Sequence, residues 1–461
     1  MAFHESVTLL QPDEYRPEGV LTINTVRQMS RQLWNKYTFH VREGTKELGV
    51  FCFWKNGARK ISVPQSVEAI GDYACVGCSK LRTVKIARDS RLGRIGDAAF
   101  HNCLRLKRVS LPEGLERIGA KCFSNTCVAR ICVPASVACI GESAFEGCAR
   151  LCAVTFARGS VLKEIGRRAF SGCRALADVA FPEGLERLGD ECFFGTALAL
   201  VVVPEGLASV GRRVFPREAA VSRPAGFRRE GVLTRREVAA AVAAVPGEAV
   251  FSVPEGVRAV DMFCFSGVSV AEVRFPASVE RVGECAFEGQ RALRAVRFAA
   301  GSRLREVGGG AFCGCAALER VSLPASVEKV GAGAFESCAG LRAADFSGGA
   351  ALREIGDAAF CGCVGLREVP LPQGLARIGA DAFSESGLYS VRIPESVTEI
   401  GRAAFSVCQE LQRVTVEEGD LPLTLGPALF AESARLRCVA LPRPVVYSNG
   451  VADLGIESDD C

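Results

Sequence analysis

The sequence has little of what most enzymes use for catalysis. Only three histidines occur in 461 residues, and none of them (His4, His40 and His101) lies beside a fixed serine or cysteine in the register of the repeats. The chain has no non-repeating cluster of Asp and Glu, and its recurrent glycines lack the lysine of a phosphate-binding loop. Because catalysis requires a local constellation of such groups, the sequence predicts a protein that is not an enzyme and that holds no metal or cofactor.

Long apolar runs are missing as well. No run approaches the roughly 20 apolar residues of a membrane helix, and the first residues lack the basic and apolar segments of a signal peptide. We therefore expect no membrane span and a cytoplasmic location. The 22 cysteines, in a chain without a visible secretion signal, predict reduced thiols rather than a disulfide framework.

A strong excess of charge of either sign is also absent. The formal net charge is +4, from 56 basic and 52 acidic residues. This balance argues against a nucleic-acid partner that is bound through bulk charge. In contrast, 49% of the residues are hydrophobic, so the chain can build a large core.

What the sequence has in abundance is one repeated phrase. The segment IGDAAFHNC at 95–103 recurs, for example as IGESAFEGC at 140–148 and VGGGAFCGC at 307–315. Sixteen copies occur in two series of eight, with steps of 22, 23 or 25 residues inside each series, and Phe stands four residues after the anchor residue in fifteen of them. Such a period predicts a solenoid. The anchors are Gly49, Gly71, Gly96, Gly119, Gly141, Gly166, Gly189 and Gly211, followed by Asp261, Gly283, Gly308, Gly331, Gly356, Gly379, Gly401 and Gly426.

The stretch YACVGCSKL at 73–81 has the C-x-x-C spacing of a metal or redox motif, but the repeat register explains both cysteines. Cys75 occupies the position that Phe occupies in the other copies. Cys78 stands seven residues after the anchor, in a position that we call column seven and that is Cys in eight copies and often Thr or Ser elsewhere. We therefore interpret both as buried structural thiols and predict that they bind no zinc.

Between the anchors runs a second phrase, which predicts a strand. LKRVSLPEGLERIG at 106–119 and LERVSLPASVEKVG at 318–331 share the pattern L-x-x-V-x-L-P, followed by V-x-x-I-G or its variants. The alternating V-x-L predicts a short half-buried strand that ends at the proline. The segment before the anchor predicts a second short extended segment, and G-x-x-A-F-x-x-C predicts about one helical turn. Stacked copies would form parallel sheets with continuous columns of side chains.

The combined phrase closely resembles the BspA-like leucine-rich repeat family over roughly residues 40–440. The resemblance implies a repeat solenoid with short parallel strands and one-turn helices. It also implies similarity to surface adhesins and host-interaction proteins, mostly bacterial and protist, so the cell surface is the alternative location.

The two series predict a tandem duplication. Residues 231–265 parallel residues 19–53 with a constant offset of 212, which persists to Gly119 and Gly331. Each half begins with a helical segment, and Thr234 with Glu237 forms a T-x-x-E capping box in the second. We interpret these leading helices as caps over the solenoid ends, with docking helices for a partner as the alternative. The predicted division is an N-terminal arm at 1–18, a cap with eight repeats at 19–215, a linker at 216–230, a second cap with eight repeats at 231–440, and a tail at 441–461.

The side chains that vary most are those predicted to point outward from the L-x-x-V-x-L strand. In the first half they begin basic and become apolar, and in the second half they carry many arginines among mixed charges. Such a face suits protein recognition, although a solvated face can also vary freely. The predicted partner-binding residues are Arg82, Lys85, Lys107, Arg108, Arg130, Leu200, Val202, Arg297, Arg320, Arg342, Arg367, Tyr389 and Arg392.

The sequence therefore predicts a non-enzymatic scaffold or adhesion-type module that binds another protein through its exposed strand face. Two alternatives remain open, namely a carbohydrate-active enzyme on a β-solenoid and a nucleic-acid binder with a basic face. The sequence indicates neither the identity of the partner nor an oligomeric state.

Overall fold

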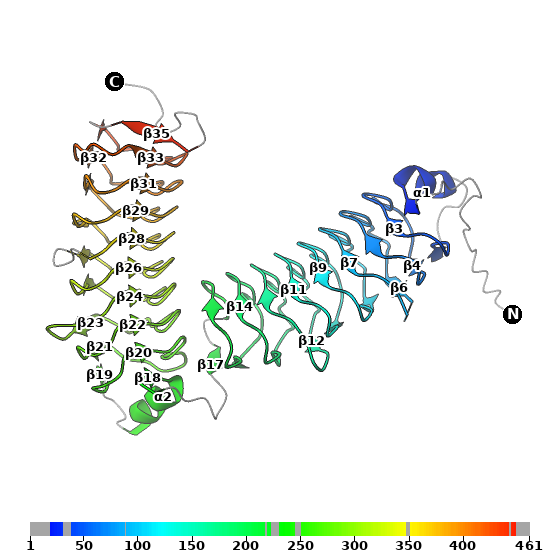
Figure 1. Cartoon of the computed structure of the whole chain (residues 1–461), viewed down its shortest axis with the longest axis horizontal. Coiled ribbons are helices and arrows are strands. Elements are labelled where there is room, and N and C mark those ends of the chain that lie inside the picture. The colour runs from blue at the N-terminus through cyan, green and yellow to red at the C-terminus, as the bar shows by residue number, and fades with distance from the viewer. Residues whose placement is uncertain are drawn as a thin grey trace. The chain divides into compact units, whose positions relative to one another are not determined.

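A computed structural model describes residues 19–30, 38–87, 89–216, 219–222, 230–244, 250–346, 351–441 and 444–448. The chain divides into two compact units, Met1–Ala220 (unit 1) and Val221–Cys461 (unit 2). Each unit is a solenoid in which successive repeats stack as parallel strands (Figure 1). The predicted arm at 1–18 lies outside the described residues, and the finer domain boundaries stay predictions.

Most repeats of unit 1 contribute to two sheets, and the repeat that contains Val179 makes only an isolated bridge to Val154 in place of a long strand. The L-x-x-V-x-L segments form long-strand sheets, in which the side chains alternate between the core and solvent. The segments before the anchors form one short-strand sheet of nine strands. The long-strand sheets are β2 (Thr38–His40), β4 (Lys60–Val63), β6 (Thr83–Ile86) and β8 (Arg108–Val109); β10 (Arg130–Val133) and β12 (Ala153–Phe156); and β15 (Leu200–Val202) and β17 (Ala220–Ser222). The short-strand sheet is β1 (Val20–Leu21), β3 (Glu47–Leu48), β5 (Ala69–Ile70), β7 (Arg94–Ile95), β9 (Arg117–Ile118), β11 (Cys139–Ile140), β13 (Glu164–Ile165), β14 (Arg187–Leu188) and β16 (Ser209–Val210).

Unit 2 repeats this arrangement. Its short-strand sheet has ten strands, and its long strands form sheets of five and three. The long strands are β19 (Val250–Ser252), β21 (Glu272–Phe275), β23 (Ala295–Phe298), β25 (Arg320–Ser322) and β27 (Ala343–Asp345), and then β30 (Ser390–Ile393), β32 (Arg413–Val416) and β34 (Cys438–Ala440). The short strands are β18 (Val232–Leu233), β20 (Ala259–Val260), β22 (Arg281–Val282), β24 (Glu306–Val307), β26 (Lys329–Val330), β28 (Glu354–Ile355), β29 (Arg377–Ile378), β31 (Glu399–Ile400), β33 (Leu423–Leu425) and β35 (Val445–Tyr447).

One helix precedes the repeats of each unit. Helix α1 spans Ile23–Ser30 and α2 spans Arg235–Ala244. The predicted capping box is present, because the Glu237 carboxylate accepts hydrogen bonds from the backbone N–H and the hydroxyl of Thr234, both at 2.8 Å. Val238 of α2 is fully buried in the core of unit 2. The role of the two helices as solenoid caps stays a prediction.

The turns after the short strands differ from the helical turn that the spacing predicted. The second residue after the anchor has a positive φ in all sixteen copies, as in Ala98 with 51°, and the sixth does so in each copy where it is described, as in Asn102 with 59°. Left-handed residues at this spacing cannot continue a right-handed helix. Instead, the N–H groups of Ala98, Phe100 and Asn102 donate to carbonyls of the next repeat at 2.7–3.0 Å. The turns therefore form a further hydrogen-bonded ladder along each solenoid.

The phenylalanine column forms the centre of the core. In unit 1 its rings stack in parallel from Phe100 to Phe215, with centroids 5.1–5.7 Å apart. In unit 2 the stack runs from Phe265 to Phe430, with centroids 4.1–6.0 Å apart. Because a ring fills each layer, neighbouring repeats cannot approach or slide without losing contact area.

Column seven supplies a donor to the backbone. The Cys78 thiol donates to the carbonyl oxygen of Phe53, which lies in the preceding repeat, with Sγ and O 2.8 Å apart. Cys338 makes the same bond to Phe312 at 3.1 Å, and the Ser433 hydroxyl makes it to Phe405 at 3.0 Å. The bond gives a second donor to a buried turn carbonyl, as at Phe53 and Phe312, whose oxygens also accept a backbone N–H within their own turn. It explains why this position accepts Cys or a small hydroxyl residue.

Candidate interaction surface

The outward-facing side chains of the long strands form a surface that we call the strand face. In β6, for example, Val84 and Ile86 are buried, whereas Lys85 between them is exposed. Period-two alternation requires this pattern once one side of the sheet packs on the core. All thirteen side chains that the sequence predicted for partner binding are exposed.

The strand face of unit 1 begins with a basic group. Arg82 and Lys107 lie side by side in adjacent repeats, because the backbone N–H of Lys107 donates to the Arg82 carbonyl at 3.0 Å. Arg108 pairs in register with Thr83, and Lys85 lies two residues further along the same strand. These four side chains make no ion pair with any residue that the structure describes.

The structure adds two residues to this group that sequence reasoning missed. The N–H of Arg82 donates to the carbonyl of Arg59 at 2.7 Å, and Lys60 pairs in register with Thr83. Both belong to the first repeat, whose leucine position is occupied by Ala58. The signal in the sequence was the interval of 13 residues from Ala58 to the anchor Gly71, the same as from Leu106 to Gly119, which places these residues at the start of a long strand although the leucine is absent.

The apolar residues Leu200 and Val202 lie apart from the basic group. Their side chains are 62% and 47% exposed, while Val201 between them is buried. Four repeats separate them from Arg108, which corresponds to roughly 19 Å at the spacing of parallel strands. The structure therefore presents two patches on unit 1, one basic and one apolar.

In unit 2, two of the predicted arginines are already engaged within the chain. The Arg297 guanidinium pairs with the Glu272 carboxylate at 3.0 Å, and Arg274 donates to the same carboxylate at 2.7 Å. Hydrogen bonding to Arg274, with the charge of Arg297, lowers the pKa of Glu272. Arg392 pairs with Glu417 at 2.5 Å. The pKa of Glu417 is lowered, mainly because its carboxylate accepts a hydrogen bond from Gln373.

The remaining predicted residues of unit 2 follow one line along the solenoid. The backbone N–H of Arg342 donates to the Glu319 carbonyl at 2.8 Å, and that of Tyr389 donates to the Arg367 carbonyl at 3.2 Å. Arg320 directly follows Glu319 and is the first residue of β25. Among the described residues, Arg320, Arg342 and Arg367 have no ion-pair partner.

A hollow of about 820 Å³ lies along this line. Arginine and glutamate side chains stand at its wall, and small residues of the neighbouring turns form the rest of the lining. The lining residues are Arg294, Ala316, Ala317, Glu319, Ala339, Gly340, Arg342, Gly365 and Arg367. The structure therefore joins Arg342 and Arg367 in one concave feature and adds Arg294 to them.

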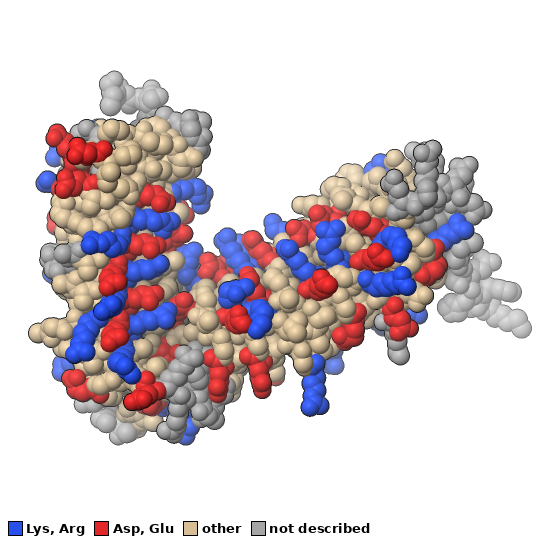
Figure 2. Space-filling view, in the orientation of Figure 1, with Lys and Arg blue, Asp and Glu red and all other residues tan. Residues whose placement is uncertain are grey.

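The short-strand sheets are different, because many of their charged side chains pair with one another, although the neighbouring Arg94 and Arg117 of unit 1 have no ion-pair partner among the described residues. Lys329 pairs with Glu354 at 3.1 Å, and Arg377 pairs with Glu354 at 3.2 Å and with Glu399 at 3.3 Å. In unit 1, Lys163 pairs with Glu186 at 2.6 Å. Basic and acidic side chains accordingly alternate in rows on the face of unit 2 that Figure 2 presents. Exposed pairs of this kind contribute little stability, about 0–1 kcal/mol each, but they leave little charge for a partner.

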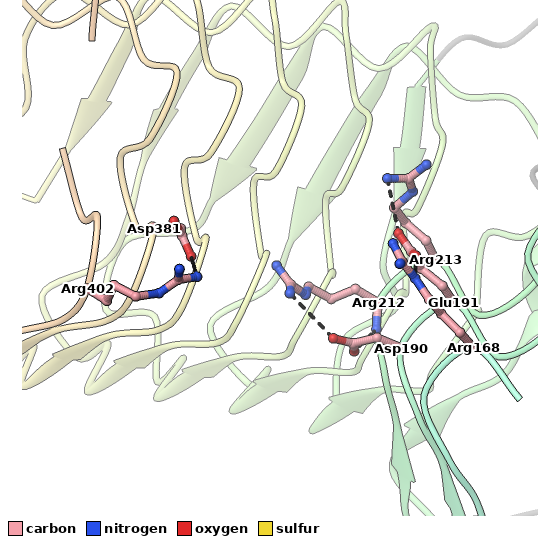
Figure 3. A network of polar contacts seen from close by, with 7 residues as sticks. All are labelled: Arg168, Asp190, Glu191, Arg212, Arg213, Asp381 and Arg402. Atoms are coloured by element: carbon pink, nitrogen blue, oxygen red, sulfur yellow. Dashed lines mark hydrogen bonds and ion pairs between the residues drawn. The ribbon is translucent and has the colours of Figure 1, made fainter. Parts of the chain in front are cut away.

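The turn edges show the same internal pairing. Figure 3 shows Glu191 between Arg168, at 2.6 Å, and Arg213, at 3.4 Å. The neighbouring Asp190 pairs with Arg212 at 3.4 Å. In unit 2, Arg402 pairs with Asp381 at 3.4 Å. These turn arginines are therefore engaged within the chain, unlike the basic side chains of the strand face of unit 1.

The repeat pattern matches one family model over most of the chain. The model of the BspA type leucine rich repeat region, in six copies, matches residues 31–93, 93–221, 249–351 and 345–449. The chain belongs to the BspA-type leucine-rich repeat family. Proteins with such repeats are a non-enzymatic kind and generally bind other proteins.

Solved structures of bacterial leucine-rich repeat proteins resemble the BspA-type chain. A leucine-rich repeat protein from Bacteroides ovatus is 20% identical, with 89% of this chain and 91% of that chain covered and a TM-score of 0.36. A leucine rich cell surface protein from Faecalibacterium prausnitzii is 19% identical, with coverages of 84% and 89% and a TM-score of 0.39. No curated protein matches the sequence.

An aromatic cluster stands on the surface of the first BspA-type repeats. The Trp54 side chain is 43% exposed, and its ring centre lies 6.3 Å from that of Phe51. The Lys55 ammonium lies 5.0 Å from the centre of the indole ring. A turn position that lies outside the core allows this exposure, and the repeat phrase fixes no residue there. Trp34 lies outside the described residues.

Two further sequence-based expectations concern metals and membranes. Within the described part of the chain, no three His, Cys, Asp or Glu side chains converge as a metal site would require. Cys75 is fully buried, and burial raises the pKa of its thiol. The two helices described, of eight and ten residues, are both too short to traverse a bilayer.

Proposed function

We propose that the protein is a non-enzymatic scaffold that binds another protein through the strand faces of its two units. The observation that carries the proposal is the contrast in charge pairing. On the short-strand sheet of unit 2 most charged side chains pair with one another, whereas the strand faces hold several arginines and lysines that have no ion-pair partner among the described residues. A partner with acidic groups can therefore use these cations without breaking existing ion pairs.

The proposed roles differ between the patches. The basic group of unit 1 attracts an acidic partner at long range, whereas the exposed Leu200 and Val202 provide contact area that is lost to water on binding. In unit 2, Arg297 and Arg392 are held in place by carboxylates, so they offer oriented donors. The proposed contact residues are Arg82, Lys85, Lys107, Arg108, Arg130, Leu200, Val202, Arg297, Arg320, Arg342, Arg367, Tyr389 and Arg392.

The test begins with cross-linking and capture of partners from the native cell, followed by measurement of the purified complex. Reversal of Lys107 and Arg108 to Glu should lower the association rate, and this effect should shrink at high salt because screening weakens long-range attraction. Leu200→Asp should instead raise the dissociation rate, because it places a charge in a desolvated contact.

The matched control is Arg305→Glu, which reverses an exposed charge next to the short-strand sheet, where Arg305 faces Glu328 at 3.9 Å. Binding and melting temperature should both stay nearly unchanged in this variant. Binding that survives all strand-face variants moves the site to the leading helices or the turns. Capture of duplex DNA in a salt-dependent manner, or release of sugars from a polysaccharide, would support the alternative functions.

We propose that the protein works in a reducing compartment, with the cell surface as the alternative. The support is the use of thiols as hydrogen-bond donors in column seven, since a disulfide has no S–H to donate. Cys132, Cys152 and Cys438 are exposed and give a direct test. A membrane-impermeant maleimide should label them only after lysis of the cells. Labelling of intact cells would place the protein on the surface.

A further inference from the structure

The hollow on unit 2 exists because three consecutive repeats lack long side chains. Two residues usually separate column seven from the leucine of the long strand. In these three repeats they are Ala316 and Ala317, Ala339 and Gly340, and Val364 and Gly365. Every other repeat with two residues at this place carries Lys, Arg or Glu in at least one of them, as in Leu104 and Arg105 of unit 1.

Backbone stacking accounts for the glycines. A Cβ added to Gly340 would lie 2.4 Å from the carbonyl oxygen of Ala316, and one added to Gly365 would lie 2.7 Å from that of Ala339. Ala317 differs, because its place in unit 1 is taken by Arg105 at an offset of 212. The repeat therefore tolerates a long side chain at position 317. The fold does not require the small Ala317, and this small residue helps to open the hollow.

The wall of the hollow offers cations that form no ion pair with a described residue. Arg294 and Arg342 make no ion pair with a described residue. Arg367 donates to the carbonyl of Gly387 at 3.3 Å through one nitrogen, and its other donors remain available. Planar guanidinium groups bind carboxylates with two parallel hydrogen bonds, which makes carboxylates the matching ligand.

We propose that this hollow binds an extended acidic peptide segment of the partner protein, with carboxylates meeting Arg342 and Arg367. The proposal rests on the proposed function and narrows it to one site and one chemistry. Glu319 stands between Arg294 and Arg342 along the line of repeats and lines the same hollow. It repels a uniformly anionic polymer but accepts a hydrogen bond from a peptide N–H, so a peptide fits better than a sulfated or phosphorylated chain. Tyr389, 52% exposed, continues the line and offers an aromatic contact.

The experiment measures binding of fluorescein-labelled ten-residue peptides to the full chain by anisotropy. The first probe has Glu at alternate positions between glycines, and matched probes have Gln or Lys in place of Glu. We expect binding of the Glu peptide only. The double substitution of Arg342 and Arg367 to Ala should weaken it about tenfold or more. Arg413→Ala removes an exposed arginine from the same face outside the hollow and should leave it unchanged.

Ala317→Arg separates shape from charge. It adds a positive charge, so nonspecific attraction would strengthen binding, whereas filling the hollow should weaken it severalfold. The melting temperature should not change, because unit 1 carries Arg105 at the equivalent position.

Three results would overturn the proposal. They are tighter binding by Ala317→Arg, insensitivity to the double substitution, and binding of heparin without the Glu peptide. Consider a captured partner that loses binding on charge reversal of the unit 1 strand face and yet binds the Ala317→Arg variant normally. That result would refute peptide binding in the hollow but would remain consistent with the proposed scaffold function.

Discussion

The two units build the same coil from equivalent positions but present different charges on their strand faces. Positions 212 residues apart are equivalent, so Lys60 of unit 1 corresponds to Glu272 of unit 2, and Lys107 corresponds to Glu319. Arg82 and Lys85 keep their charge as Arg294 and Arg297. The face of unit 1 therefore begins uniformly basic, whereas that of unit 2 alternates basic and acidic residues.

The difference teaches how one backbone can present two kinds of surface. On unit 1 the cations of the basic group have no ion-pair partner among the described residues, which suits long-range attraction. On unit 2 Glu272 holds Arg297 in place, and short side chains open a hollow beside Arg342. The core columns are nearly the same in both units because stacking requires them, whereas the outward positions are free to diverge.

The largest expected effect tests whether the phenylalanine column stabilises both units equally. Phe312 is fully buried and stacks on Phe287 at 4.9 Å and on Phe335 at 5.2 Å. Phe312→Ala should lower the free energy of unfolding by about 3–5 kcal/mol, because it leaves a cavity between two rings. Its equivalent, Phe100, stacks on Phe123 and has Cys75 on its other side, so Phe100→Ala should cost less. Urea unfolding followed by circular dichroism measures both. A Phe312→Ala unfolding curve that coincides with that of wild type would show that the assigned register of the phenylalanine column is wrong.

The reciprocal variant fills the gap in unit 1. Cys75→Phe introduces the residue that unit 2 has at Phe287, where Phe275 packs against that ring at 5.9 Å. Unit 1 has the smaller Val63 at the position of Phe275, so space is available. We expect a change in unfolding free energy below about 1.5 kcal/mol. A loss as large as that of Phe312→Ala would mean that the two cores are packed differently.

A smaller effect is expected from the thiols of column seven. Cys315 donates to the carbonyl of Phe287 at 3.3 Å, and its equivalent Cys103 donates to that of Cys75 at 3.1 Å. Each carbonyl also accepts a backbone N–H, from Gln290 at 3.2 Å and from Cys78 at 3.3 Å respectively, so replacement of either thiol by Ala removes one of two donors and should cost about 0.5–1.5 kcal/mol. Replacement by Ser keeps a donor and should cost less. Burial raises the pKa of Cys315, so labelling by a disulfide reagent should require unfolding. Fast labelling of the native chain would contradict this.

The smallest effect concerns the pair that distinguishes unit 2. The pKa of Glu272 is lowered from its ordinary value of 4.5, mainly by the hydrogen bond from Arg274. Because the folded state binds fewer protons, this contribution to stability is present above pH 4.5 and is lost as the pH falls through the lowered pKa. The melting temperature of Glu272→Gln should therefore lie slightly below wild type at pH 7 and converge with it in acid. Equal melting temperatures at both pH values would mean that Glu272 acts only by orienting Arg297.

Much of this molecule was determined by the sequence alone. The spacing of Gly, Phe and Cys predicts the solenoid, the layers of its core and the alternation along each long strand, because stacked identical layers bury the same positions every time. This is why residues such as Lys85 and Arg342 could be placed on the exposed face without a structure. The same reasoning predicted that Cys75 and Cys78 belong to core columns.

Only the tertiary structure decided what surrounds those exposed side chains. It showed that Arg297 is paired with Glu272 while Arg342 has no such partner among the described residues, that the turns bond to the next repeat through left-handed residues, and that Trp54 is exposed. These features depend on distances between residues of neighbouring repeats, set by the stagger and rotamers of side chains about 4.8 Å apart. A repeat phrase specifies which positions face inward. The contacts between outward side chains, and with them the hollow of unit 2, follow only from three-dimensional packing.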